Sequence, residues 1–426
     1  MPAPFPPDRP VFSFYGDDFT GSTDALEALA ASGVPAVLFL RPPDDADLCA
    51  FAWCRAIGIA GESRSRAPGW MRAELPPVFQ RLREIGAPVV QYKVCSTFDS
   101  SAQTGSIGCA LEIGQEIFGT ACVPVVPAAP LLGRYVVFGN LFATDGKGVH
   151  RIDRHPSMSR HPVTPMDEAD LLVHLGRQTS RRLELVDLLE LWSGSREWPA
   201  NAEAVVFDGL NPMDMVEAAR QIWERRDGPQ TFVVGSSGFT YGLLTYWRAK
   251  GWLPEPTAVG SPAVRNEGRV LVLAGSCSPA THAQVHSALR SGFHGVRLNP
   301  VRWDPVEAQA EAVAQLAGGR SVILYSAAAK EDRVEMEDPP AFAAALGRLL
   351  RAVILASGVT RVVVAGGDTA SHAARELGIT ALTFSASLVR GAPLCRAHGW
   401  PGALELVLKG GQIGPESFFE DVLAWA

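Results

Sequence analysis

Short apolar runs that end in small, polar turns and lead into helical patterns recur along the whole chain. The run Val11–Tyr15 meets the turn Gly16–Gly21, and a helical pattern that carries Leu26 and Leu29 then ends at Gly33. Further strands are predicted at Val34–Leu40, Ala56–Ala60, Pro88–Tyr92, Val270–Ala274, Gly295–Leu298, Ser321–Tyr325 and Arg361–Ala365. Because helices are the usual connections between parallel strands, this alternation predicts an α/β fold with parallel sheets.

The length of the chain, 426 residues, predicts two domains, since a single hydrophobic core rarely organises so many residues. Periodicity is lost between Gly251 and Gly268, where Pro, Gly and Ser gather as they do in interdomain linkers. We place the boundary there and expect domains at 1–255 and 256–426. Each domain is expected to contain a mainly parallel sheet flanked by helices, with an active-site cleft between the two domains.

Composition and charge exclude several classes of protein. The formal net charge is −7, and no block of Lys and Arg suggests binding to a nucleic-acid backbone. No apolar run is long enough to span a membrane, and the N-terminus lacks the basic and apolar parts of a signal peptide. The seven cysteines lie scattered, without zinc-binding or CxxC spacing, which indicates reduced thiols. We therefore expect a cytoplasmic enzyme with a small-molecule substrate, and we leave homo-oligomerisation open.

The turn after the first predicted strand contains two adjacent carboxylates, Asp17 and Asp18. It lies at the carboxyl end of a strand, where open parallel sheets bind ligands. Each carboxylate can accept a hydrogen bond from a substrate hydroxyl, hold a metal, or take a proton from an attacking hydroxyl. Helix N-capping is the structural alternative for the same two residues.

Two other loops follow predicted strands of the first half. The loop Tyr92–Ser101 contains a cation, hydroxyls and a carboxylate, which suits a polyhydroxy acid, although polar runs of this kind also form turns. We expect Lys93 to meet the acid group. The loop Ser63–Arg66 offers a guanidinium that can clamp a carboxylate with two hydrogen bonds. The candidate substrate residues of these loops are Arg64, Lys93, Ser96, Thr97, Asp99 and Ser100.

The stretch His150–Met166 contains three histidines and three arginines among prolines, but their spacing does not match a zinc site. Within it, Thr164 followed by Pro165 predicts the start of a helix, with a capping hydroxyl and proline in the first turn. We expect His161, just upstream of this helix, to reach the substrate.

The second half contains glycine-rich turns that suit a phosphate. Gly275–Pro279 and Gly366–Ala370 each follow a predicted strand and open a helix, so that backbone amides and hydroxyls face a ligand. Asp368 can hold Mg²⁺ or act in catalysis. None of these turns fits a Walker A or a full GxGxxG pattern, and each is also compatible with a purely structural turn. The candidate nucleotide residues are Ser276, Ser278, Gly366, Gly367, Asp368, Thr369, Gly410 and Gly411.

Taken in order, these segments resemble the motifs of the four-carbon acid sugar kinase family. The resemblance covers nearly the whole chain, and KVCSTFDSS with HPVTPM is most similar to the 3-oxo-tetronate kinase branch. It implies an N-terminal domain that binds a sugar acid, a C-terminal domain that binds ATP, and Mg²⁺-dependent phosphorylation of the 4-hydroxyl. The matched motifs imply substrate contacts at Asp17, Arg64, Lys93, Ser96, Thr97 and Asp99, and nucleotide contacts at Ser276, Gly366, Gly367 and Gly411.

The resulting hypothesis is an ATP-dependent kinase of a four-carbon sugar acid, with 3-oxo-tetronate as the favoured substrate. Asp17 or Asp18 would act as base or orient the hydroxyl, and Asp368 with Mg²⁺ would offset phosphate charge. The alternatives are a D-threonate or D-erythronate kinase, or a non-catalytic sensor of a sugar acid and a nucleotide. A nicotinamide-dependent oxidoreductase is disfavoured, because the chain lacks the dinucleotide-binding fingerprint.

Overall fold

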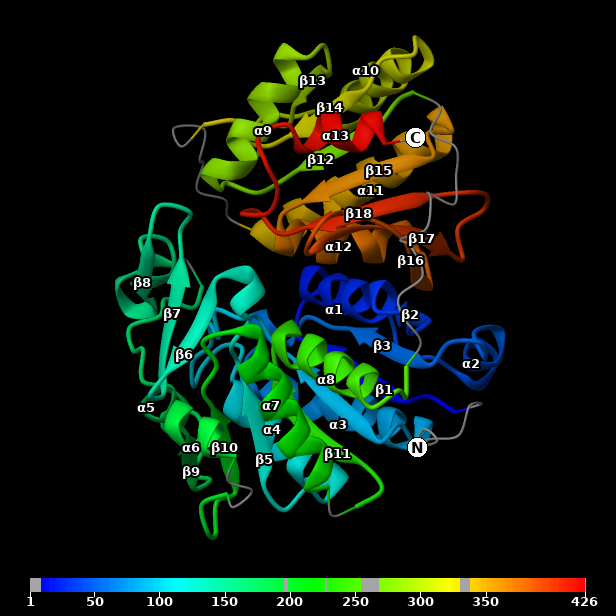
Figure 1. Ribbon diagram of the computed structural model, residues 1–426. Helices are drawn as coiled ribbons and strands as arrows, with labels where there is room; N and C mark the ends of the chain where they lie inside the picture. Colours follow the sequence, from blue (N-terminus) through cyan, green and yellow to red (C-terminus); the bar gives the residue numbers. More distant parts are fainter. Residues whose placement is uncertain are drawn as a thin grey trace. The chain divides into compact units, whose positions relative to one another are not determined.

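The structure is a computed structural model that describes residues 9–161, 163–194, 198–226, 228–253, 268–329 and 338–425 (Figure 1). The chain divides into two compact units. The N-terminal unit consists of residues 1–36 and 42–256, and the C-terminal unit of residues 37–41 and 257–426. Residues 254–267, which make up most of the linker expected from the sequence, lie outside the described residues.

A parallel sheet forms the centre of the N-terminal unit. Its strands run in the order β3, β1, β4, β11, β5, β10 and β9, and β1 pairs through Phe14 with Gly58 on one side and Gln91 on the other. Nearly all their side chains are buried, as expected for a sheet covered on both faces. The strands are β1 (Phe12–Gly16), β3 (Ala56–Ala60), β4 (Val89–Lys93), β5 (Val123–Val126), β9 (Leu183–Val186), β10 (Ala204–Phe207) and β11 (Thr231–Gly235).

Helices cover both faces of this sheet. Helices α1, α7 and α8 pack together, α6 packs on α7, and α3, α4 and α5 form a second group. Figure 1 shows α7 and α8 in front of the sheet in that view. The helices of this unit are α1 (Phe19–Ala31), α2 (Asp45–Ala50), α3 (Pro68–Ile85), α4 (Ile107–Phe118), α5 (Leu171–Gly176), α6 (Leu188–Ser193), α7 (Pro212–Glu224) and α8 (Ser237–Ala249).

A small antiparallel sheet follows β5 in the N-terminal unit. Strands β6 (Arg134–Val137), β7 (Asn140–Thr144) and β8 (Val149–Arg151) are joined by tight turns, and Tyr135 pairs with Phe142. Nothing in the alternation of strands and helices predicted this insertion, because its strands are short and partly exposed.

Parallel strands also form the centre of the C-terminal unit. Strands β13, β14, β12, β15 and β18 are parallel, and β17, β16 and β2 continue the sheet in antiparallel pairs. The strands are β2 (Ala36–Phe39), β12 (Leu271–Ala274), β13 (His294–Arg297), β14 (Val322–Tyr325), β15 (Arg361–Ala365), β16 (Ala381–Val389), β17 (Ala392–His398) and β18 (Glu405–Lys409).

Helices α9 and α13 pack together over an apolar core of the C-terminal sheet, and α11 packs between α10 and α12. The core side chains include Val272, Val363 and Phe418, all with 0% exposure. The helices are α9 (Pro279–Arg290), α10 (Pro305–Ala317), α11 (Pro339–Ser357), α12 (Gly367–Leu377) and α13 (Phe418–Ala424). No helix among the described residues has the length and apolarity needed to cross a membrane.

The predicted α/β fold is confirmed, and Ala56–Ala60 and Arg361–Ala365 are strands with the predicted bounds. The strand predicted at Val34–Leu40 also exists, but its core, Ala36–Phe39, pairs with β16 of the C-terminal unit. Thr383 lies opposite Val37, more than 300 residues away in the chain. Local sequence patterns contain no information about a pairing across such a separation.

Candidate active site

Asp17 and Asp18 lie between the end of β1 and the start of α1. Asp18 is the N-cap of the helix, since its carboxylate accepts hydrogen bonds from the Gly21 amide at 2.8 Å and the Thr20 hydroxyl at 2.6 Å. Helix N-capping, the structural role that the sequence left open for both residues, is therefore the role of Asp18. Asp17, which is 4% exposed, takes no part in the cap, so its carboxylate can accept hydrogen bonds from other groups.

Arg64 joins the two carboxylates. Its Nη2 and Nε donate to Asp17 at 2.6 and 3.1 Å, and Nη1 and Nη2 donate to Asp18, each at 2.9 Å. The guanidinium lies in the loop after β3, so this contact connects the ends of neighbouring strands. The carboxylate clamp predicted for Arg64 is thus formed with carboxylates of the protein itself. The contacts of Arg64 with a substrate stay a prediction.

The two carboxylates differ in their affinity for a proton. Burial raises the pKa of Asp17 to about 6, although Arg64 opposes this shift. Burial also disfavours the charged form of Asp18, but Arg64, Thr20 and the Gly21 amide together lower its pKa below the ordinary value. Asp18 is held ionised by its four hydrogen bonds, whereas Asp17 accepts two and keeps lone pairs for a further donor.

Lys93 ends β4 and packs against the first turns of α1. Its ammonium lies 3.4 Å from Asp24 Oδ2, and both residues are buried. Asp24 Oδ1 is also buried, and among the described residues it has no hydrogen-bond partner. A Cβ atom on Gly21 would lie 3.0 Å from Lys93 Nζ and 2.5 Å from Asp18 Oδ1. Glycine at this position therefore allows the lysine to approach the Asp18 carboxylate.

The loop after β4 brings the predicted polar residues together. Thr97 donates to Asp99 Oδ1 at 2.6 Å, and Thr164 donates to Asp99 Oδ2 at 3.1 Å. Thr164 also lies 3.2 Å from His161 Nδ1, so His161 reaches the loop through Thr164. Ser100 lies 2.8 Å from His174 Nε2. The remaining predicted residue of this loop, Ser96, is 9% exposed.

One expectation for this region was wrong. No helix starts at Thr164; α5 begins at Leu171, and Asp170 caps it. Thr164 has a proline after it, but its hydroxyl is bonded to Asp99 and does not cap a backbone amide. Arg66, the other arginine of the Ser63–Arg66 loop, forms an ion pair with Glu62 and lies over the ring of Trp70. It therefore takes no part in the group formed by Asp17, Asp18, Asp24, Arg64 and Lys93, hereafter the Asp17 cluster.

Sequence reasoning missed Asp24, Thr164 as a ligand of Asp99, and His174. The position of Asp24 carried a signal, because it lies three residues after Gly21 and therefore on the same face of the predicted helix. His174 carried none. It is 74 positions from Ser100, and burial lowers its pKa to about 4, which keeps the ring neutral.

The predicted nucleotide residues converge in the C-terminal unit. Ser278 caps α9, and its hydroxyl donates to the Gly411 carbonyl at 2.5 Å. A Cβ atom on Gly411 would lie 2.3 Å from Ser276 Oγ, and one on Gly366 would lie 3.1 Å from the Ser276 amide nitrogen. Gly366 has φ +121°, which favours glycine. A Cβ atom on Gly275 would lie 2.2 Å from Thr369 Oγ1. The ends of β12, β15 and β18 thus bring backbone and hydroxyl groups into close contact.

Lys409, which the sequence analysis did not assign, ends β18 beneath these turns. It is fully buried, and its Nζ lies 3.5 Å from Thr281 Oγ1. Burial lowers its pKa to about 7, and no carboxylate among the described side chains forms an ion pair with it. Gly367 and Asp368 begin α12, and Gly410 follows Lys409. The Asp368 side chain lies outside the described part of the structure.

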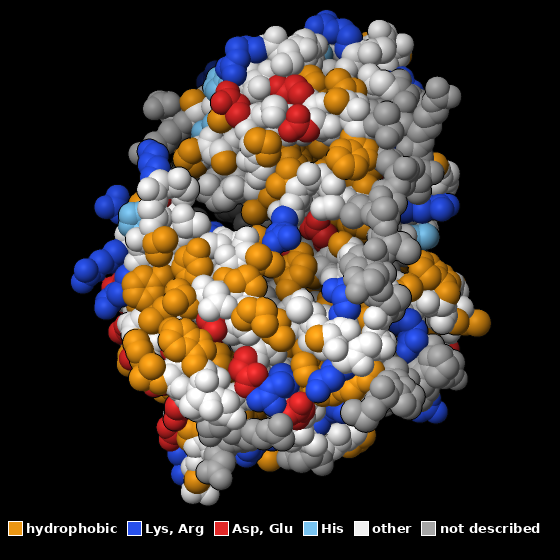
Figure 2. Space-filling view, viewed as in Figure 1, with side chains coloured by type: hydrophobic (Ala, Val, Ile, Leu, Met, Phe, Trp, Pro, Cys, Tyr) orange, Lys and Arg blue, Asp and Glu red, His pale blue; other side chains and the backbone are white. Residues whose placement is uncertain are grey.

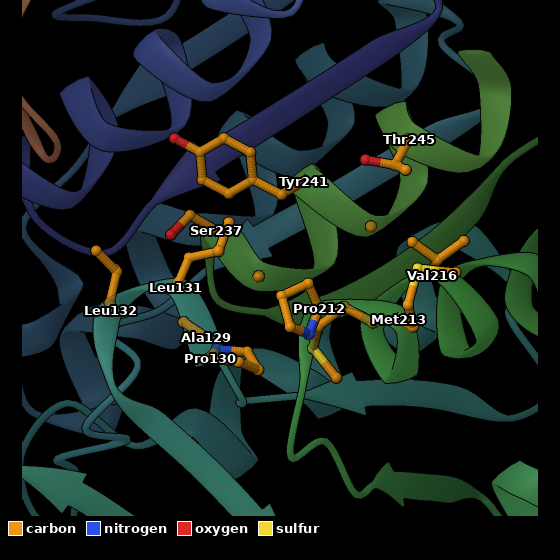
Figure 3. A pocket seen from close by; sticks show the side chains of 13 residues that line it. Ala129, Pro130, Leu131, Leu132, Pro212, Met213, Val216, Ser237, Tyr241 and Thr245 are labelled. Atoms are coloured by element: carbon orange, nitrogen blue, oxygen red, sulfur yellow. The ribbon is translucent and has the colours of Figure 1, made fainter. Parts of the chain in front are cut away.

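No group of three or more His, Cys, Asp or Glu side chains among the described residues is arranged as a metal site requires. The largely apolar pocket of the N-terminal unit lies elsewhere, with a volume of about 120 Å³. Figure 3 shows Ser237 and Tyr241 of α8 facing Pro130 and Leu131 of the turn after β5. Apolar side chains also gather on the face of this unit that carries α7 and α8 (Figure 2). None of the predicted substrate residues lines this pocket.

Comparison with known proteins identifies the family. Residues 12–243 match a family described as a sugar-binding N-terminal domain, and residues 271–419 match a nucleotide-binding C-terminal domain. The chain is 46% identical to a 3-oxo-isoapionate kinase of Paraburkholderia graminis, over 96% of this chain and 93% of that protein. The chain belongs to the four-carbon acid sugar kinase family.

Another curated relative and two solved structures are less similar. A 3-oxo-tetronate kinase of Pseudomonas savastanoi pv. phaseolicola is 32% identical over 97% of each chain. A solved structure from Salmonella typhimurium LT2 has a TM-score of 0.76 and 26% identity, and covers 96% of this chain and 98% of that one. A Haemophilus influenzae structure, with a TM-score of 0.69 and 24% identity over 97% and 99% of the two chains, shares the fold.

Replacing Gly21 with alanine is expected to disturb the contact region of Asp18 and Lys93 and preserve the fold. The new Cβ must displace Asp18 or Lys93, whereas alanine itself favours the helix by about 0.5–1 kcal/mol. We expect kcat/KM for a sugar acid to fall at least about tenfold, equivalent to about 1.4 kcal/mol. A coupled assay of ADP release measures this change.

Gly69→Ala is the matched control, because a Cβ on this α3 glycine meets no atom within 4 Å. It should keep normal kinetics. Equal kinetics for the two variants would show that the close contact of Lys93 and Asp18 does not require glycine at position 21.

Proposed function

We propose that this protein is an ATP-dependent kinase that phosphorylates a hydroxyl of a 3-oxo sugar acid. The observation that carries the proposal is the Asp17 cluster of the N-terminal unit. There Asp17, a carboxylate with unused lone pairs, lies beside the partly buried Arg64 and the buried Lys93. Phosphoryl transfer to an alcohol uses a carboxylate that orients the hydroxyl and accepts its proton, together with groups that offset phosphate charge.

We propose which acid is the substrate from the names of the relatives. The motifs KVCSTFDSS and HPVTPM favoured 3-oxo-tetronate, but the relative with 46% identity is named a 3-oxo-isoapionate kinase and those named 3-oxo-tetronate kinases reach about 30%. Both names share a 3-oxo sugar acid. We propose 3-oxo-isoapionate as the preferred substrate and 3-oxo-tetronate as a weaker one, each phosphorylated at the 4-hydroxyl.

Asp17 is the better of the two candidate bases. Asp18 is engaged as the cap of α1 and by Arg64, and its lowered pKa makes it a weak proton acceptor. In the proposed reaction the substrate hydroxyl attacks the γ-phosphorus of ATP while its proton passes to Asp17. The new P–O bond forms as the bond from the γ-phosphorus to the β-γ bridging oxygen breaks, and ADP leaves with that electron pair. Asp17 then returns the proton to solvent.

The C-terminal unit is proposed to bind the nucleotide, with residues 256–426 as its domain and 1–255 as the sugar-acid domain. Gly366 and Gly411 approach Ser276 so closely that neither position has room for a side chain. Backbone amides can therefore face a ligand there, and such amides bind phosphate groups. The buried Lys409 ammonium lies close to the same turn and would be stabilised by a phosphate. Mg²⁺ bound with ATP would offset phosphate charge, and Asp368 remains its candidate ligand from sequence.

The direct test of the proposal is ADP release from ATP and Mg²⁺ with a panel of acids. We expect ADP with 3-oxo-isoapionate, less with 3-oxo-tetronate, and little with D-threonate or D-erythronate. Detection of the phosphorylated acid by ³¹P NMR excludes simple ATP hydrolysis. Binding of an acid and ATP without any ADP release would instead support the non-catalytic sensor.

Asp17→Asn is expected to lower kcat by about 10²- to 10⁴-fold, the usual contribution of general base catalysis, with KM for ATP nearly unchanged. Because burial raises the pKa of Asp17 to about 6, its carboxylate is mostly protonated at pH 5 and mostly ionised at pH 7. The wild-type kcat/KM for the acid should therefore rise with pH through about 6. The variant should lack this rise.

Asp45→Asn is the control for this variant, since Asp45 is exposed on α2. It should retain both the rate and the pH profile. An unchanged rise near pH 6 in Asp17→Asn would assign the titration to another group and remove Asp17 as the base.

Gly411→Ala should raise KM for ATP at least about tenfold and leave KM for the acid unchanged. The new methyl would lie 2.3 Å from Ser276 Oγ and 3.1 Å from Ser278 Oγ, so the turn must open. Gly318→Ala is the control, because Gly318 follows α10 with φ −75° and the nearest atom to a Cβ there would be the Gln315 carbonyl oxygen at an acceptable 3.4 Å. Steady-state kinetics would contradict the nucleotide assignment if the two variants had the same KM for ATP.

A further inference from the structure

Arg134, at the start of β6, has a guanidinium that is only partly satisfied. Its Nη1 donates to the backbone carbonyls of Leu132 at 2.5 Å and Gly133 at 3.3 Å. Its Nε is buried, and among the described residues Nε has no hydrogen-bond partner. The edge formed by Nε and Nη2 is the edge with which arginine binds a carboxylate through two parallel hydrogen bonds. In the described part of the structure, no protein carboxylate forms an ion pair with this edge.

The position of Arg134 connects it with the Asp17 cluster. Arg134 forms a β-bridge with Ala129, three residues after the end of β5. Val126 at the end of β5 is in register with Gly235 of β11, and Gly235 is in register with Lys93 of β4. Arg134 therefore lies at the same carboxyl edge of the sheet as Lys93 and Asp17, as a cation without a counter-ion among the described residues.

The other two cations of the cluster differ from Arg134 in this respect. Arg64 binds two carboxylates, and their charge raises its pKa well above the ordinary value against the effect of burial. Lys93 has Asp24 at 3.4 Å. For Arg134, burial dominates and its pKa is lowered, which is the signature of a charge that lacks compensation. A carboxylate that arrives with a ligand gains more beside Arg134 than beside a cation already paired.

We infer that Arg134 binds the carboxylate of the sugar acid and so makes the enzyme selective for acids over neutral sugars. This inference rests on the proposed function and gives Arg134 the role that sequence patterns suggested for Lys93. Arg64 and Lys93 then hold Asp17, Asp18 and Asp24 in place, and Arg134 binds the opposite end of the substrate from the reacting hydroxyl. A neutral analogue leaves the guanidinium desolvated and unpaired, which explains the selectivity.

The test compares Arg134→Gln and Arg134→Lys with the wild-type protein by isothermal titration calorimetry, without nucleotide. The ligands are 3-oxo-tetronate, 3-oxo-isoapionate and the primary amide of each acid. We expect Arg134→Gln to weaken binding of the acids at least about 30-fold and binding of the amides less than threefold. Arg134→Lys should recover part of the loss, because it keeps the charge but not the planar pair of donors.

Arg151→Gln is the matched control, since Arg151 lies in β8 of the same small sheet and already pairs with Asp153. It should bind acids and amides as the wild type does. Equal losses for acid and amide in Arg134→Gln would show a merely structural role, and an unchanged affinity for the acid would also overturn the inference. ADP release by the wild type reports on the proposed function separately, because calorimetry measures binding even where no transfer occurs.

Discussion

The contact of Arg64 with the two buried carboxylates Asp17 and Asp18 is the interaction on which the N-terminal site depends. Two adjacent carboxylates repel each other, and burial of either is unfavourable unless a cation compensates it. One planar guanidinium from the loop after β3 donates to both and thereby fixes the turn that follows β1. The same contact divides their roles, because Asp18 is consumed by the helix cap and Asp17 keeps free acceptor capacity.

The sequence predicted the positions of these groups well, because they depend on local patterns. Each apolar run that ends in polar residues marks the carboxyl end of a strand, and parallel strands bring such ends to one edge of a sheet. Asp17 after β1 and Lys93 after β4 are therefore neighbours for a reason that can be read in the chain. The same reasoning brought Ser276 and Gly366 together in the C-terminal unit, whereas Gly411 was implied by the family motif. The glycines are explained by close approach to Ser276.

The partners of these groups could not be predicted, because they come from distant segments. Patterns around Arg64 indicated a clamp for a carboxylate, but only coordinates show that its carboxylates are Asp17 and Asp18. The bond from Thr164 to Asp99 replaced a helix start that looked plausible locally. Arg134 attracted no notice, since its distinguishing property is the lack of a carboxylate among the described residues, and sequence patterns do not reveal a missing neighbour.

Arg64 and Lys93 pair with carboxylates of the protein, whereas Arg134 is the cation proposed to bind the ligand. A crystal structure with a bound 3-oxo sugar acid tests this division most directly. It should show a substrate hydroxyl within hydrogen-bonding distance of Asp17, the substrate carboxylate on Arg134, and Arg64 still bonded to Asp17 and Asp18. A substrate carboxylate that displaces Asp17 or Asp18 from Arg64 would contradict the account, because the acid would then occupy the position assigned to the protein's own carboxylates.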